Sequence, residues 1–340
     1  MHDPFFIPPI PWLQRATAPV AEVLSLPSLP YHIHEVLVGS LVYGIIYYPL
    51  SPAISRLFFS SHYNKLSRAR RLNWDAHVVS LVQSCLINAL ALWVMFTDEE
   101  RKTMGWQERV WGYTSACGMV QGLATGYFLW DLIVTSRNMD VFGFGTLAHA
   151  ISALAVYSLG FRPFLNYYAC NFILWELSTP FLNIHWFLDK LGMTGSSIQL
   201  YNGFLLISTF FSCRLVYGTY QSYLVFKDVW SAVGAHPDLT YFVDKEVSAH
   251  TMKFATENSS VPFWLAVAYL ASNITLNSLN SYWFYKMIQA LHKRFQVTST
   301  EPQGEAKMPG KSTALKDTVS QSRLRHVTSV KSEPELDVVI

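Results

Sequence analysis

The chain has 340 residues, of which 51% are hydrophobic and 15% aromatic, while only 14% are Asp, Glu, Lys or Arg. A typical soluble domain carries about 25% charged residues, so this composition excludes a disordered chain and disfavours an ordinary cytosolic enzyme. The formal net charge of +2 also excludes a strongly basic surface of the kind that binds nucleic acid.

The first 33 residues form a proline-rich lead. They contain seven prolines, and proline removes a backbone donor and breaks helices. We expect an irregular or short-helical lead over 1–33, without the basic, apolar and cleavage regions of a signal peptide.

Seven apolar runs follow, and about 20 apolar residues suffice to cross a bilayer as a helix. The first run contains Pro49 and Pro52, which predict a bend or an early end. The sequence therefore predicts an all-α polytopic transmembrane bundle of about seven spans. The runs cover residues 34–59, 76–96, 109–135, 141–160, 163–187, 198–226 and 262–291.

Charged residues between the runs predict the orientation. The connection after the first run carries five basic residues before its first acid, Asp75. The positive-inside rule places this loop in the cytosol, the N-terminus in the lumen and the C-terminus in the cytosol. The basic residues are Arg56, Lys65, Arg68, Arg70 and Arg71.

Residues 293–340 change in character, because they are rich in Ser, Thr, Lys and Glu and poor in aromatic residues. Such a segment buries too little apolar surface to offset its ordering entropy, so it predicts a disordered cytosolic tail. We divide the chain into the lead over 1–33, a flanking helix with its basic loop over 34–65, a membrane domain over 66–292, and this tail.

Ionisable residues inside apolar runs are costly in hydrocarbon, so each is a candidate site residue. His149 and Glu176 lie midway along the fourth and fifth runs, and Arg214 lies near the middle of the sixth. Helical rise places them at similar depth, where either a Glu–His or a Glu–Arg pair would make burial tolerable. Asp131 and His185 lie closer to the cytosolic surface. A purely structural role stays open for all five.

The common catalytic and metal motifs are missing from the sequence. It contains no P-loop, no HExxH and no GxSxG. Its four cysteines form no CxxC pair and lie in apolar runs, which indicates buried apolar side chains. We therefore expect no metal site and no resident cofactor.

The chain resembles the TLC-domain family, the integral membrane domain shared with the ceramide synthases, from about Leu66 to Leu291. The smaller TLC-domain proteins are the most similar branch. The most specific stretch is ELSTPFLN, over 176–183. Supporting stretches are Trp74, GYFLWDL over 126–132, Asn202-Gly203, and Phe210-Phe211 with Arg214.

This resemblance implies six TLC helices plus one flanking N-terminal helix, residence in the endoplasmic reticulum or another internal membrane, and a role in lipid metabolism. In the synthases a paired His motif serves acyl transfer from acyl-CoA, whereas here His149 is followed by Ala150. Thr179 also stands where the synthases place another acid. Ceramide synthase activity is therefore not implied.

Three functions remain open. The first is lipid homeostasis through binding of membrane-lipid acyl chains in the helical bundle. The second is an acyl-CoA-dependent acyltransferase in which His149 and Glu176 are catalytic, with acyl-CoA as substrate. The third is a lipid transporter. Asp131, His185, Asn202 and Arg214 are the expected substrate-binding residues, the expected partners are membrane lipids rather than nucleic acid, and homo-oligomerisation is left open.

Overall fold

The computed structural model describes residues 3–239 and 250–298, with the side chains of 293–298 excepted. The described residues divide into a unit that ends at Phe284 and a second unit that begins at Tyr285. Of the second unit the structure describes the end of the last helix. The described residues contain helices and connecting turns and no strand, which confirms the predicted all-α class.

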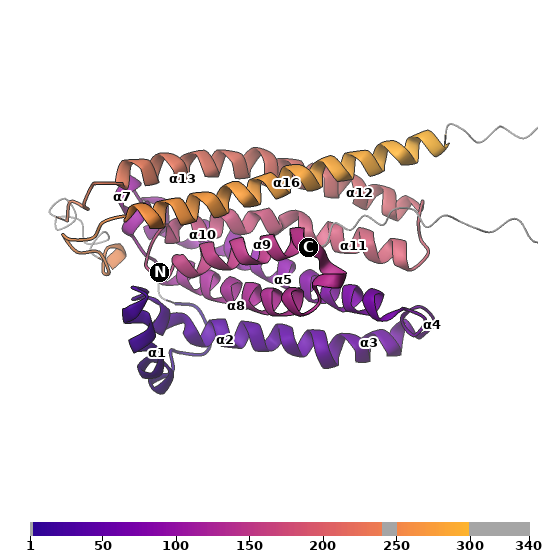
Figure 1. The fold of residues 1–340 in the computed structure, drawn as a ribbon, viewed down its shortest axis with the longest axis horizontal. Helices are drawn as coiled ribbons and strands as arrows, with labels where there is room; N and C mark the ends of the chain where they lie inside the picture. The colour runs from indigo at the N-terminus through magenta and orange to yellow at the C-terminus, as the bar shows by residue number, and fades with distance from the viewer. Residues whose placement is uncertain (1–2, 240–249, 299–340) are drawn as a thin grey trace, which may run out of the picture. The chain divides into compact units, whose positions relative to one another are not determined.

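The helices follow the order of the predicted apolar runs (Figure 1). They are α1 (Pro11–Val23), α2 (Leu29–Ile45), η1 (Ile46–Leu50), α3 (Ser51–Phe58), α4 (Ser60–Tyr63), α5 (Arg68–Thr97), α6 (Glu99–Lys102), α7 (Trp106–Trp111), α8 (Ser115–Arg137), α9 (Met139–Leu159), α10 (Asn166–Ile173), η2 (Leu174–Ser178), α11 (Thr179–Lys190), α12 (Ser197–Thr209), η3 (Phe210–Tyr217), α13 (Gly218–Ala232) and α16 (Phe263–Thr298).

Four helical segments among the described residues are long and apolar enough to cross a membrane: Leu29–Phe58, Arg68–Thr97, Trp106–Arg137 and Met139–Leu159. The three remaining predicted runs are also helical, as α10–η2–α11, α12–η3–α13 and α16. The membrane protein class is thus supported by the longest apolar helices.

The predicted end of the lead and the predicted start of the tail differ from the ends of the observed helices. The lead contains helix α1, and α2 begins at Leu29, inside the segment predicted as lead. Pro11 and Pro30 stand at first-turn positions, where proline is tolerated because the N–H would have no helical partner. Helix α16 continues through Thr298, while the rest of the predicted tail, 299–340, lies outside the described residues.

Successive segments of the first unit run back and forth, so that their connections alternate between two ends (Figure 1). The turns after α3 and α11 lie at one end. The α7 region, the turn after α9 and the segment before α16 lie at the other. The basic residues after α3 therefore gather at one end of the bundle.

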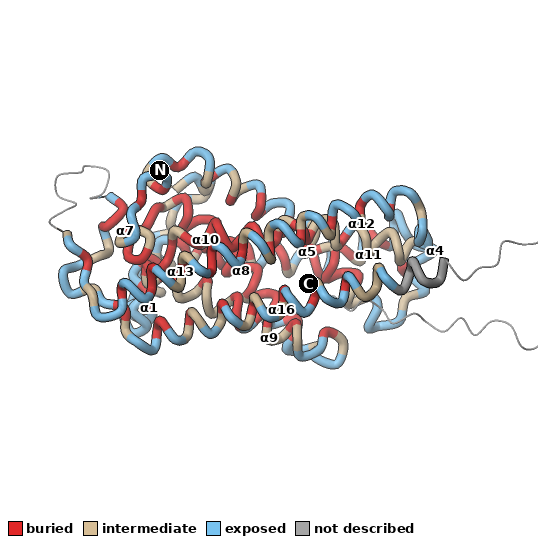
Figure 2. The backbone as a smooth tube through the Cα atoms, turned by 90° about the horizontal axis from the view of Figure 1, so that it is seen from above, coloured by how far each residue is buried: buried red, intermediate tan, exposed pale blue. Residues whose placement is uncertain are grey.

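Helix α8 is central in the packing and is buried along most of its length (Figure 2). Glycines four residues apart on α8 bring its backbone close to α2. A Cβ on Gly126 would lie 2.4 Å from the carbonyl oxygen of Val36, and one on Gly122 would lie 2.3 Å from Glu35 Oε2. Small residues at this spacing let membrane helices approach closely, which explains the tight α2–α8 pair.

Three segments depart from regular α-helix. The π-helical η1 contains Pro49, the predicted bend of the first run, and η3 over Phe210–Tyr217 is also π-helical. The segment η2 over Leu174–Ser178 is a 3₁₀-helix. Such irregular turns in membrane helices often mark functional positions, and η2 and η3 carry Glu176 and Arg214.

Candidate functional site

A buried ion pair joins η2 to η3. The Nη2 atom of Arg214 lies 3.6 Å from Oε1 of Glu176, and both residues are only 6% exposed. Of the two pairings that the sequence left open, the structure therefore contains the Glu–Arg pair. A buried pair of this kind is tolerated when further hydrogen bonds satisfy the charged groups.

The guanidinium of Arg214 is satisfied by groups on three helical segments. Its Nε donates to the carbonyl oxygen of Trp175 at 2.6 Å and to Ser178 Oγ at 3.2 Å. Its Nη2 donates to Thr179 Oγ1 at 2.9 Å, and its Nη1 donates to Asn280 Oδ1 on α16 at 3.0 Å. Arg214 thereby fixes the irregular segments against each other and against α16.

Glu176 is held on its other side by a short local bond. The hydroxyl of Thr179 donates to Glu176 Oε2 at 2.8 Å. Pro180 follows at a first-turn position of α11, so the ELSTP stretch forms a 3₁₀ turn that leads into a new helix. The turn formed by the ELSTP stretch thus orients the carboxylate of Glu176 toward Arg214.

His149 lies in an aromatic environment beside this pair. Its ring centroid is 5.6 Å from that of Trp283 and 6.2 Å from that of Phe128. Glu176 and Arg214 are both close enough to act on it electrostatically. Within the described residues, His149 Nδ1 has no hydrogen-bond partner although it is buried.

A second unpaired group belongs to Asn280 on α16, which is bonded to Arg214. Asn280 accepts from Arg214 through Oδ1, but its Nδ2 is buried and has no hydrogen-bond partner in the described part of the chain. A buried polar group without a partner costs about 1–3 kcal/mol. We call His149, Glu176, Arg214 and Asn280 the central cluster.

Asp131 lies near the central cluster without bonding to it. The hydroxyl of Thr135 on the same helix donates to Asp131 Oδ1 at 3.2 Å. Glu176 acts on Asp131 electrostatically, and both carboxyl groups act on the neighbouring Tyr127. Asp131 is thus a peripheral member of the same charged region.

His185 and Asn202 belong to a different contact. Asn202 Nδ2 donates to the carbonyl oxygen of Phe181 at 2.8 Å, and a Cβ on Gly203 would lie 3.5 Å from the ring of His185. Both residues therefore hold α11 against α12. Their expected role in substrate binding stays a prediction, and the hydrogen bond of Asn202 indicates a packing role.

The sequence analysis missed a buried polar contact between α5 and α11. The ring of His77 stacks on Trp186 with centroids 4.0 Å apart, and its Nδ1 donates to Asn183 Oδ1 at 2.7 Å. Asn183 Nδ2 donates to Ser80 Oγ at 3.1 Å. The i, i+3 spacing of His77 and Ser80 places both on one face of α5, and this spacing was the available signal.

Two hollows in the described part of the chain are lined by residues other than the central cluster. One has a volume of about 10 Å³, room for about one water, and lies between Gln121, Tyr157, Phe172 and Tyr269. The other is an open groove of about 460 Å³ on α2 and η1. Its lining is Leu37, Ser40, Leu41, Gly44, Ile45, Tyr48 and Pro49.

The contacts of Glu176 bear on whether His149 can act in acid–base chemistry. An acid that orients a catalytic histidine is hydrogen-bonded to it, whereas the contacts shown for Glu176 are with Thr179 and Arg214. The unpaired Nδ1 of His149 is instead available to a polar atom of a ligand. The central cluster is therefore better suited to binding than to proton transfer.

Comparison with known proteins agrees with the resemblance. The family model of the TLC domain matches residues 73–289. An uncharacterized TLC domain-containing protein of Schizosaccharomyces pombe is 38% identical over 83% of this chain and 86% of its own length. Topoisomerase I damage affected protein 4 of Saccharomyces cerevisiae is 28% identical over 77% of this chain and 85% of its own length. TLC domain-containing protein 4-A of Xenopus laevis is 26% identical over 79% and 94%.

Proposed function

Because this chain belongs to the TLC-domain family, we propose that it acts in membrane-lipid homeostasis by binding a lipid at the central cluster. The polar part of the lipid pairs with His149 and Asn280, and its acyl chains pack on apolar surface beside them. Membership of the TLC-domain family does not by itself give a role in lipid homeostasis. The central cluster is the observation that supports this role.

The observation that carries this proposal is the pair of unpaired buried groups beside a satisfied ion pair. His149 Nδ1 and Asn280 Nδ2 have no hydrogen-bond partner within the described residues. A carbonyl, hydroxyl or phosphate oxygen of a lipid supplies the missing partners. The ion pair of Glu176 and Arg214 keeps the surrounding helices in place while the lipid exchanges.

The outward faces next to the central cluster fit the apolar part of such a ligand. Phe144 and Ile151 on α9 are 73% and 52% exposed, and Tyr282 on α16 is 53% exposed. Large exposed apolar side chains of this kind face lipid in a membrane protein rather than water. Acyl chains therefore lie along α9 and α16 beside His149.

Acyl transfer is the alternative function. It requires His149 as base or acyl carrier and Glu176 as its orienting acid. The contacts of Glu176 with Thr179 and Arg214 favour lipid binding over this chemistry, since they occupy the carboxylate that would orient His149.

The experiment is lipid retention by the purified protein. The full chain and its His149→Phe and Asn280→Leu variants are extracted in mild detergent, and co-purifying lipids are quantified by native mass spectrometry. Leu86→Ala is the control, because Leu86 on α5 is also exposed to a large extent and lies outside the proposed lipid-binding faces of α9 and α16. We expect the wild type and the control to retain one class of lipid and the two variants to lose most of it.

The same samples separate the alternatives. Equal lipid retention by all four proteins would contradict binding at the central cluster. Incubation with acyl-CoA and candidate acceptors tests acyl transfer, and a product that depends on both His149 and Glu176 would support the enzyme instead. Lipid movement between vesicles, without any product, would support the transporter.

We also propose residence in the endoplasmic reticulum, with the basic end of the bundle in the cytosol. The support is the gathering of Arg56, Lys65 and the basic start of α5 at one end (Figure 1). Basic residues in short connections favour the cytosolic side.

A further inference from the structure

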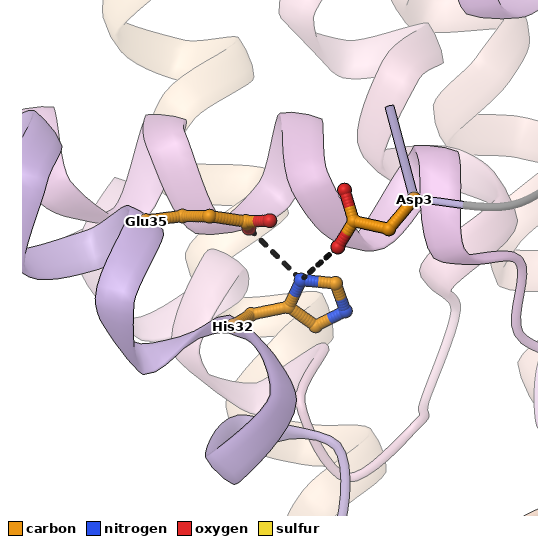
Figure 3. A group of neighbouring side chains, drawn as sticks. All are labelled: Asp3, His32 and Glu35. Carbon is orange, nitrogen blue, oxygen red and sulfur yellow. Dashed lines mark hydrogen bonds and ion pairs between the residues drawn. The ribbon is translucent and has the colours of Figure 1, made fainter. Parts of the chain in front are cut away.

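A group of polar side chains separate from the central cluster converges at the start of α2. Figure 3 shows Asp3 from the lead and His32 and Glu35 from the helix. Nδ1 of His32 lies 2.9 Å from Glu35 Oε2 and 3.7 Å from Asp3 Oδ2. One ligand atom from each of the three residues lies within 4.8 Å of the others.

The lead is docked so that one oxygen of Asp3 faces His32. The backbone N–H of Phe5 donates to Asp3 Oδ1 at 2.9 Å, which turns Oδ2 toward the imidazole (Figure 3). Farther along, Nε2 of His34 donates to the carbonyl oxygen of Ile7 at 2.9 Å, and its ring packs against Phe5. The lead therefore brings a carboxylate to α2 by specific contacts.

The helical members of the group are deeply buried and held in place. His32 is 1% exposed and Glu35 is 0% exposed. Helix α8 has glycines where these side chains lie, since a Cβ on Gly118 would lie 2.3 Å from His32 Nε2 and one on Gly122 would lie 2.3 Å from Glu35 Oε2. The absence of side chains at Gly118 and Gly122 thus leaves room for the imidazole of His32 and the carboxylate of Glu35.

One oxygen of this buried carboxylate has no hydrogen-bond donor. Glu35 Oε1 accepts no hydrogen bond from the described residues, and Nε2 of His34, which already donates to Ile7, lies 4.0 Å away. Two carboxyl groups that converge in a buried place repel when both are ionised, unless a proton or a cation lies between them. The two carboxyl groups of Asp3 and Glu35 therefore require either a shared proton or a cation between them.

We propose that Asp3, His32 and Glu35 bind a divalent metal ion of the zinc class. One imidazole nitrogen and two carboxylate oxygens are a ligand set that zinc accepts, with water in the fourth position. Ligands about 2.1 Å from a tetrahedral zinc lie roughly 3.4 Å apart. The distances of 2.9 Å and 3.7 Å lie on either side of that value, so small side-chain movements accommodate the ion.

The second ring nitrogen of His32 is already oriented as in a metal site. Nε2 is hydrogen-bonded to the hydroxyl of Tyr113. With the metal at Nδ1, Nε2–H donates to this hydroxyl, and such an outer contact fixes the tautomer and the ring orientation of a ligating histidine. Tyr113 is therefore a positioning residue of the site.

The positive side chain of Lys253 acts on this group of residues electrostatically. Nζ of Lys253 lies over the rings of Tyr113, Phe254 and Tyr31 at 4.5, 5.0 and 5.6 Å from their centroids. Its single charge offsets one of the two carboxylates at a distance. Metal binding then adds a link between the lead and α2 to the contacts that already dock the lead.

The test is zinc binding by the full chain, with its purification tag at the C-terminal end so that the lead is unaltered. The protein is placed in phosphatidylcholine nanodiscs, stripped with a chelator and titrated with Zn²⁺ against a fluorescent zinc indicator. We expect one tight ion per chain. Asp3→Asn, His32→Asn and Glu35→Gln should each weaken this binding by about 100-fold or more, and Tyr113→Phe by about 10-fold.

Asp3→Asn is the decisive variant. Its remaining carbonyl oxygen still accepts from the N–H of Phe5, so the lead keeps its local turn while one metal ligand is lost. The controls are His62→Asn and Asp140→Asn, which alter exposed residues of the same types. Circular dichroism and thermal melting of each stripped protein separate loss of metal binding from loss of fold.

Cobalt provides a second readout. Co²⁺ bound by these ligands in tetrahedral geometry gives strong visible absorption, which should disappear in Asp3→Asn and persist in both controls. Absence of a stoichiometric zinc site, or equal zinc affinity in the wild type and Asp3→Asn, would overturn the proposal and leave a proton shared by the two carboxyl groups. Neither result bears on lipid binding at the central cluster, which uses other residues.

Discussion

Arg214 and Glu176 approach to 3.6 Å between Nη2 and Oε1, and they do so from the two irregular segments η3 and η2. The irregular backbone and the ion pair therefore depend on each other. The π-helical turn carries the guanidinium to a point where it reaches a backbone carbonyl, two hydroxyls, an amide and a carboxylate.

Removal of the cation should destabilise the fold strongly. Arg214→Met leaves Glu176 buried without its counter-ion, and breaking a buried pair in this way costs about 3–5 kcal/mol. Glu176→Gln should cost less, since Arg214 keeps its other acceptors. Thermal melting in detergent measures both. Arg137→Met is the control because Arg137 is exposed. An unchanged melting temperature in Arg214→Met would contradict the structural role of the pair.

The close contact between α2 and α8 predicts that a larger side chain at Gly126 destabilises the fold. Gly126→Ala places a methyl group 2.4 Å from the carbonyl oxygen of Val36, so the helices must separate. We expect a loss of about 1–3 kcal/mol from this overpacking. Gly44→Ala on α2 is the matched control, since no atom lies within 4 Å of its Cβ position and alanine favours a helix. Equal melting temperatures for the two variants would show that α8 does not approach α2 this closely.

The polar contact between α5 and α11 should respond to Asn183→Leu. This variant removes the acceptor of His77 and one donor to Ser80, so the buried Nδ1 of His77 loses the partner shown for it. The expected cost is about 2–3 kcal/mol. Asn202→Leu removes a single bond to a backbone carbonyl and should cost less. If denaturant or thermal unfolding ranks the two variants in the opposite order, the polar contact is not a principal link between α5 and α11.

The proposed orientation predicts opposite labelling of the two ends. In a chain whose four native cysteines are replaced, Arg70→Cys should react with a membrane-impermeant maleimide once the plasma membrane alone is permeabilised. Glu257→Cys should react only after the internal membranes are opened as well. Both positions are exposed. The reverse pattern would place the basic end in the lumen and overturn the orientation.

The fold class followed from the sequence because apolar runs of about 20 residues leave few alternatives to membrane helices. Boundaries were harder to predict. Pro30 suggested an irregular lead, yet α2 begins at Leu29 because proline fits the first helical turn. The glycines of α8 were visible in sequence, but which helix they face depends on tertiary packing.

The site was predicted in part. Glu176 and Arg214 were singled out by the cost of charge in hydrocarbon, and the structure pairs them. Asn280 was missed because amides are common in such helices and only the contact with Arg214 distinguishes it. Asp3 was missed because its proximity to His32 depends on how the lead folds back, which no local pattern shows.

Photo-crosslinking tests lipid binding at the central cluster most directly. The chain is reconstituted with a photoactivatable phospholipid, with and without excess unlabelled lipid, and the crosslinked residues are mapped by mass spectrometry. We expect crosslinks at the buried residues Phe128 and Trp283 around His149 that excess lipid removes and that His149→Phe abolishes. Crosslinks confined to exposed residues away from α9 and α16, such as Leu86, and unchanged in His149→Phe would contradict lipid binding at the central cluster.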